Sequence, residues 1–354
     1  MRTSGIQKID SRKPMVSATR KDTLILYGTF LFFSALAVYC NYVFVYTTND
    51  TINVSFREAA LESYEWTLAG IESRPMQYRV MASYLIWVIE SSTRMDPIVI
   101  DVMFKVLFLF LSVVPLHMIS CRYLSPPGAL AVVFLYLLEV VVGLTSGYSV
   151  YYTNDIILLA CLHWCILLAV RRQYLLCVLC LVVATLAREV SVVILVYLGM
   201  RVFRGKMRFS WFIVSLLAFL IPLTYLRLMY PAPVQDWAWW DMIFVNVPGF
   251  NLIGSHFENV RHLDTVTVLR NNIKAFMLFN VLWILSIKNI WRYRDPFIVD
   301  IALTMLFYMG LVYAFGYIRE PRLFLPCSVL ILPTAMIELE KVANRIVSDV
   351  HTNH

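Results

Sequence analysis

Long apolar runs, separated by short polar or charged segments, follow one another along almost the whole chain. Several of these runs approach or exceed the ~20 residues that a helix needs to cross a bilayer. The pattern predicts an all-α fold, a polytopic membrane helix bundle with about ten transmembrane helices. The expected spans are 24–46, 98–119, 128–146, 154–170, 173–187, 190–203, 210–229, 273–289, 297–315 and 322–340.

The segment between the first two spans is unlike the rest. Residues 56–70 alternate charged and apolar positions at helical spacing, which is typical of a helix that lies on a membrane surface. Residues 77–92 are apolar but short, so they either cross the membrane or lie along it. Lying flat is favoured, because every later basic cluster then falls on the same side. We therefore expect two juxtamembrane interfacial helices within an outer loop at 47–96, with a span at 77–92 as the alternative.

The distribution of basic and acidic residues predicts how the chain is oriented in the membrane. Residues 1–21 form a basic tail, whereas 47–75 are mainly acidic, and basic flanks stay on the cytoplasmic side. Both termini are then cytoplasmic: the tail at 1–21 precedes a bundle at 22–340, and a second tail follows at 341–354. A second outer loop is expected at 230–272, where tryptophans suit the headgroup layer.

Composition narrows the function classes. Hydrophobic residues make up 60% of the 354 positions and charged residues only 15%, whereas soluble domains carry about 25% charged residues. The sequence contains no zinc-ligand spacing, phosphate-binding glycine loop or nucleophile elbow. The net charge of +7 is explained by orientation, so no nucleic-acid partner is expected. Lys105 and Glu139 lie inside apolar runs and are interpreted as a candidate pair.

Charged residues interrupt the apolar pattern near the ends of several spans. Arg319, Glu320 and Arg322 lie between two apolar runs, where charge is costly unless it is balanced. They form either a capped turn whose arginines reach lipid phosphates, or a phosphate clamp, because arginine presents a planar fork that matches phosphate oxygens. Arg188-Glu189 is either a structural ion pair, or an arginine that faces a ligand anion with a glutamate that orients it.

Further candidates lie at the same expected outer face. Glu62 and Glu65, three residues apart on one side of a helix, are either a solvated surface or a source of a general base. Asp50, directly after the first span, competes for that role. Asp155 begins a span and either complements the helix dipole or belongs to the site. Arg79 either anchors the short apolar helix or binds substrate.

Short motifs from about residue 24 to 340 carry a resemblance. They are Arg74-Pro-Met-Gln-Tyr-Arg-Val80, Asn154-Asp155, Ala187-Arg-Glu189 and Glu320-Pro-Arg-Leu-Phe-Leu-Pro326. With the cytoplasmic start, single span and acidic outer loop before them, they resemble the bacterial membrane proteins of the GT-C glycosyltransferase superfamily. The chain departs from that pattern in having no proline at the end of Tyr78-Arg-Val-Met-Ala-Ser83.

The resemblance implies an enzyme that moves a sugar from a polyprenyl-phosphate carrier to a lipid or glycan acceptor at the outer membrane face. It implies a catalytic carboxylate in the first outer loop, on Glu62 or Glu65 with Asp50 as the rival. It implies that Arg188, Arg319 and Arg322 hold the donor phosphate. A divalent metal is compatible with this chemistry, although no ligand cluster demands one.

The expected location is a cell membrane, with a bacterial inner membrane preferred. Two other functions stay open at this point. One is a membrane transporter or lipid flippase, whose signature is inverted repeats and broken helices. The other is a polysaccharide polymerase or ligase, which also uses arginines at the outer face.

Overall fold

The computed structural model describes residues 20–49, 56–69, 79–145, 153–229, 265–293, 295–315 and 321–352. Every regular element in these ranges is a helix, so the all-α prediction is confirmed for the described chain. Seven helices are long and apolar enough to cross a membrane, which indicates a multi-pass membrane protein. They are α1 (Arg20–Asn49), α4 (Pro97–Ser120), α5 (Pro126–Thr145), α6 (Thr153–Val170), α9 (Phe209–Met229), α14 (Pro296–Phe315) and α15 (Ser328–Thr352).

Helix α6 forms the centre of the bundle and packs most extensively against α4 and α7 (Tyr174–Ala187). It is buried along almost its whole length. The outer helices α1 and α9 instead expose large apolar side chains, among them Phe32 and Ile221. Long helices with exposed apolar faces require an apolar surrounding, and lipid provides it.

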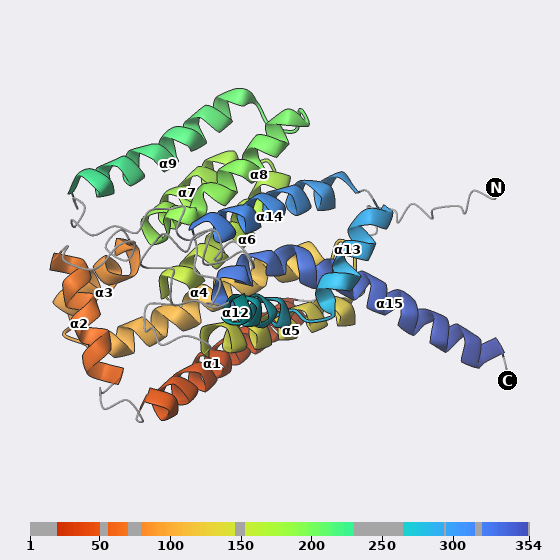
Figure 1. Cartoon of the computed structure of the whole chain (residues 1–354), viewed down its shortest axis with the longest axis horizontal. Coiled ribbons are helices and arrows are strands. Elements are labelled where there is room, and N and C mark those ends of the chain that lie inside the picture. Colours follow the sequence, from red (N-terminus) through yellow and green to blue (C-terminus); the bar gives the residue numbers. More distant parts are fainter. Residues whose placement is uncertain are drawn as a thin grey trace.

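Helices α2 (Phe56–Ala69) and α3 (Val80–Thr93) lie across one end of the bundle (Figure 1). Each has 14 residues, which corresponds to about 21 Å of helix. The hydrocarbon core of a bilayer is about 30 Å thick. Length alone does not separate α3 from predicted short crossings such as α7, which also has 14 residues. The place of α3 beside α2 at the end of the bundle favours the flat arrangement over the span at 77–92.

A sharp connection sets the angle between α3 and α4. Helix α3 ends at Arg94, whose φ of 59° returns its N–H to the carbonyl of Glu90. Asp96 then caps α4 by accepting a hydrogen bond of 2.8 Å from the N–H of Ile98, and Pro97 occupies the first helical position. A capping aspartate and a proline at the first helical position both favour the start of a helix. The first turns of α4 consequently begin beside α3.

The helices at 174–203 are joined by a turn at Arg188-Glu189, as the sequence predicted, and we call this turn the hairpin tip, although α7 and α8 pack mainly against other helices and not against each other. Helix α7 stops at Ala187, Arg188 adopts an extended conformation, and a short 3-10 helix η3 (Glu189–Ser191) leads into α8 (Val192–Phe203). The hairpin tip thus carries Arg188 and Glu189 to the same end of the bundle as α3, which packs against α7.

The prediction of one continuous span at 273–289 is wrong. The structure has two helices there, α12 (Thr265–Met277) and α13 (Leu282–Tyr293), interrupted at 278–281. Asn280 has a positive φ of 46° at the break, a conformation that Asn adopts more readily than most residues. Leu278 and Phe279 are buried and hold the break in the core.

The last span begins with a second 3-10 segment, η5 (Pro321–Cys327), which precedes α15. The hydroxyl of Tyr308 on α14 donates a 2.7 Å hydrogen bond to the carbonyl of Leu323. The residues of η5 from Arg322 onward are buried. The segment is therefore fixed inside the bundle, and Arg322 with it.

Candidate functional site

Four segments that are distant in sequence meet at the end of the bundle covered by α2 and α3. They are the first turn of α6 with Asp155, the hairpin tip with Arg188, the start of η5 with Arg322, and the residue before α3, Arg79. Arg79, Asp155, Arg188 and Arg322, which the sequence analysis named as candidates, therefore lie together at this end of the bundle. We refer to Arg79, Asp155, Arg188, Glu189 and Arg322 as the arginine network.

Asp155 is the centre of the arginine network. One carboxylate oxygen accepts a hydrogen bond from Nη1 of Arg188, and the other accepts one of 3.1 Å from Nη1 of Arg322. The three side chains are only 3–6% exposed. Since buried charges must be paired, this carboxylate stabilises both arginines inside the bundle.

Arg79 and Glu189 form the more accessible side of the network. Their side chains pair at 3.5 Å, and Glu189 is 25% exposed. Burial lowers the pKa of Arg79, the neighbouring Arg188 lowers it further, and Glu189 and Asp155 act in the opposite direction. Among the residues that the structure describes, the network thus joins three arginines and two carboxylates.

Asn154 connects the arginine network to α3. Its side-chain oxygen accepts a 3.1 Å hydrogen bond from the N–H of Ala82, and its Nδ2 donates one of 2.9 Å to the carbonyl of Arg79. The first N–H groups of a helix lack partners within the helix, and here a side chain from α6 supplies one. The position of Arg79 is therefore fixed by α6.

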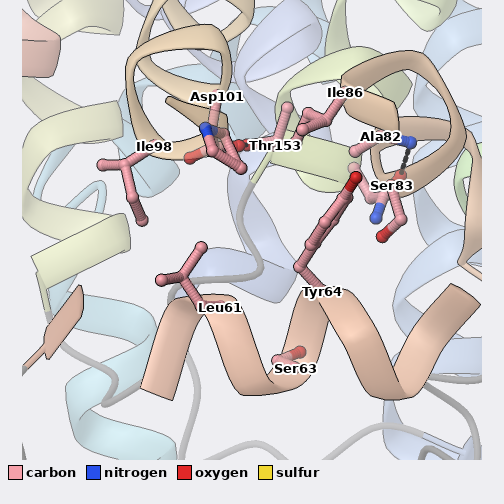
Figure 2. A pocket seen from close by; sticks show the side chains of 11 residues that line it. Leu61, Ser63, Tyr64, Ala82, Ser83, Ile86, Ile98, Asp101 and Thr153 are labelled. Atoms are coloured by element: carbon pink, nitrogen blue, oxygen red, sulfur yellow. Dashed lines mark hydrogen bonds between the residues drawn. The ribbon is translucent and has the colours of Figure 1, made fainter. Parts of the chain in front are cut away.

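A small cleft with a volume of about 50 Å³ lies on the other side of Asn154, between α2, α3 and the first turns of α4 and α6 (Figure 2). In Figure 2, Leu61 and Tyr64 reach from α2 toward the opposite wall. The lining residues are Leu61, Ser63, Tyr64, Ala82, Ser83, Ile86, Pro97, Ile98, Asp101, Thr153 and Asn154. Polar groups thus alternate with apolar ones in a cleft that adjoins the arginine network.

Asp101 is the carboxylate of this cleft. It accepts a hydrogen bond from the Thr153 hydroxyl and pairs with Lys105, one helical turn further along α4, at 2.6 Å. The candidate pairing of Lys105 with Glu139 is therefore wrong, because a carboxylate on its own helix is already in contact. The cleft carboxylate is held in position by both partners.

Tyr64 is the polar side chain that α2 contributes to the cleft. Its hydroxyl donates a 2.7 Å hydrogen bond to Glu90 on α3. Burial, and then this hydrogen bond, raises the pKa of Tyr64. The hydroxyl consequently stays protonated at neutral pH and links the two helices that cover the cleft.

The predicted outer-loop carboxylates lie elsewhere on α2. Glu62 and Glu65 are exposed, whereas Ser63 and Thr67 form the buried side of the helix. Neither glutamate lines the cleft. Their role as a general base stays a prediction. Asp50, Arg319 and Glu320 lie outside the described residues.

Sequence reasoning gave Asp101 and Tyr64 no role in the site, and it named Asn154 only as part of the Asn154-Asp155 motif. A signal existed for Asp101, since an acidic residue four positions before Lys105 in an apolar run predicts an ion pair on one helix face. Nothing local marked Asn154 as a cap for α3, because its two partners lie 72 and 75 residues away.

Within the ranges that the structure describes, no three His, Cys, Asp or Glu side chains are grouped so that they could hold a metal ion. Comparisons with protein-family models, curated proteins and solved structures found no match. The geometry of the arginine network and the cleft is therefore the basis for a functional assignment.

Proposed function

We propose that this protein is a membrane glycosyltransferase that moves a sugar from a polyprenyl-phosphate carrier to a lipid or glycan acceptor. The observation that carries the proposal is the arginine network, with Arg79, Arg188 and Arg322 gathered beside a polar cleft at one end of a membrane bundle. The resemblance to the GT-C superfamily supports the same reaction class.

The arginine network suits the phosphate of a lipid carrier. A guanidinium binds two phosphate oxygens at once, and in a site with little water its attraction to an anion is stronger than in solution. Apolar faces on neighbouring helices would accommodate the polyprenyl chain in the same bilayer.

The reaction needs a base and a stabilised leaving group. The acceptor hydroxyl loses its proton to a carboxylate as its oxygen bonds to the anomeric carbon. The bond from that carbon to the phosphate oxygen breaks, and the electron pair leaves with the phosphate. Arg188 and Arg322 stabilise the negative charge that develops there. We assign the base to Asp101, because it lines the cleft while Glu62 and Glu65 do not.

We also propose ten membrane spans with both termini in the cytoplasm. To the seven long helices we add α7, α8 and the interrupted pair α12–α13 as three further crossings. Helices α2 and α3 then lie in the outer interface, and the cleft opens outward. The basic residues at 1–21 and 171–172 fall on the cytoplasmic side, as the positive-inside rule favours. A bacterial inner membrane is the location that we propose.

Purified protein in a neutral detergent is expected to gain stability from a polyprenyl phosphate and not from the polyprenol of equal chain length. A ligand at 100 times its Kd stabilises a folded protein by about 2.7 kcal/mol. Unfolding is followed as a function of temperature at a series of lipid concentrations. Only the phosphate distinguishes the two lipids, so their difference reports its binding.

Two variants test whether the stabilisation depends on the arginine network. Arg322→Gln is expected to weaken the stabilisation at least tenfold in lipid concentration, whereas Arg292→Gln, an exposed arginine on α13, leaves it unchanged. Equal stabilisation of the unmodified protein by phosphate and alcohol would rule out a phosphate site. That comparison stands even if Arg322→Gln fails to fold.

A transporter or lipid flippase is the second candidate. The interruption between α12 and α13, with Asn280 at positive φ, favours it, since transporters place broken helices at their binding sites. The two candidates differ in product. A transferase converts the carrier to free polyprenyl phosphate, whereas a transporter returns it unchanged on the other side of a vesicle membrane.

A further inference from the structure

A second cluster of charged and polar side chains lies at the end of the bundle opposite the cleft. It joins the last turns of α8, the first turns of α14 and the turn that follows α4 (Figure 1). None of its residues belongs to the arginine network or the cleft. We call it the distal cluster, and its members are Arg122, Tyr197, Arg201, Arg204, Asp295 and Asp300.

Three arginines of the distal cluster gather around the start of α14. The guanidinium of Arg122 lies over the ring of Phe297, 5.7 Å from its centroid. Nε of Arg204 donates a hydrogen bond to Asp300. Arg201 lies in the last turn of α8, which packs against α14, three residues before Arg204. Arg122 and Arg204 thus contact the first turns of α14, and Arg201 lies on the adjoining helix.

The two carboxylates of the distal cluster have different roles. Asp295 caps α14 by accepting a 2.8 Å hydrogen bond from the N–H of Phe297, and it accepts a further bond from the Tyr123 hydroxyl. Asp300 is only 1% exposed and uses one carboxylate oxygen for Arg204. These described side chains, three arginines and two carboxylates, carry a net charge of +1.

Three buried polar atoms of this cluster have no hydrogen-bond partner among the residues that the structure describes. They are the Tyr197 hydroxyl, Nε of Arg201 and the second carboxylate oxygen of Asp300. Tyr197 and Arg201 are one turn apart on α8, which packs against α14. Buried polar atoms without partners are uncommon and cost stability. Within the described ranges, two donors and one acceptor of the distal cluster are thus without a hydrogen bond.

We propose that the distal cluster binds the headgroup of an anionic phosphodiester lipid that carries a hydroxyl, such as phosphatidylglycerol. The phosphate oxygens accept hydrogen bonds from the Tyr197 hydroxyl and Nε of Arg201. The headgroup hydroxyl donates to the free oxygen of Asp300. The lipid charge of −1 matches the cluster charge of +1. Basic pockets between membrane helices are known binding places for such headgroups.

The test uses the full-length protein in a neutral detergent, titrated with phosphatidylglycerol and, separately, with phosphatidylcholine, while bound lipid is counted by native mass spectrometry. Phosphatidylglycerol is expected to bind at least tenfold more tightly. Tyr197→Phe and Arg201→Gln are each expected to weaken its binding at least tenfold. Arg208→Gln removes the same charge from the exposed loop before α9 and is expected to change binding less than twofold.

Tyr197→Phe is the more informative variant, because it changes no charge. Removing a hydroxyl without a partner costs little stability, so folding is expected to be kept. Unchanged lipid binding by Tyr197→Phe would overturn the proposal, and so would equal losses in Arg201→Gln and Arg208→Gln. Competition by inorganic phosphate or glycerol phosphate at the same concentration as the lipid would keep the phosphate site and identify the free anion as its ligand.

Discussion

Asp155→Ala is expected to lower the free energy of unfolding by about 3–5 kcal/mol, because it removes the carboxylate that two buried arginines contact. Arg188 and Arg322 each donate to one oxygen of this carboxylate, and both arginines are buried. The measurement is unfolding of the purified protein in mixed micelles as the fraction of denaturing detergent is raised.

A matched variant shows whether the loss of stability in Asp155→Ala comes from unbalanced charge or from lost packing. Replacing all three residues, as Asp155→Ala/Arg188→Met/Arg322→Met, removes the whole buried ion pair system. Apolar replacements of buried ion pairs are often neutral or stabilising, so most of the lost stability is expected to return. A loss below about 1 kcal/mol in Asp155→Ala, the range of surface ion pairs, would contradict the account of this carboxylate.

Asp101→Asn is expected to reduce sugar transfer at least about 100-fold, the contribution typical of a general base. Asn keeps the size of the side chain but cannot accept the proton of the acceptor hydroxyl. Glu62→Ala/Glu65→Ala, on the exposed side of α2, is expected to keep most of the activity. Turnover is followed with an isotopically labelled polyprenyl-phosphate sugar as donor.

The control for Asp101→Asn addresses Lys105, which the substitution leaves buried without its partner. In Asp101→Asn/Lys105→Met no unpaired charge remains, so folding is expected to recover while transfer stays low. Recovery of transfer in the double variant would show that Asp101 acts only through Lys105. Full activity in Asp101→Asn together with complete loss in Glu62→Ala/Glu65→Ala would assign the base to the outer side of α2.

Sequence reasoning was most successful where one physical rule acted alone. Apolar run length predicted the helices, because each membrane span must satisfy its own backbone hydrogen bonds. Charge between the runs predicted that Arg188, Asp155 and Arg322 would meet, because residues at the ends of successive spans alternate between two faces. The residues are up to 167 positions apart, yet the constraint of a bilayer places them together.

Sequence reasoning failed where a tertiary contact decided the outcome. The interruption at 278–281 lies in a segment with one polar residue, Asn280, and average hydropathy gives no sign of it. Burial of Phe279 fixes the break, and that burial depends on neighbouring helices. Asp101 likewise became part of a site only through Thr153, which lies 52 residues away.

The most direct test of the central claim is mass spectrometry of the lipids that copurify with the unmodified protein and with Arg188→Ala/Arg322→Ala. The account predicts a polyprenyl phosphate or its sugar conjugate on the unmodified protein, and its loss from the variant. The mass of a conjugate would also identify the class of sugar. Bulk phospholipid alone on the unmodified protein would contradict the account and leave the arginine network as a structural contact between helices.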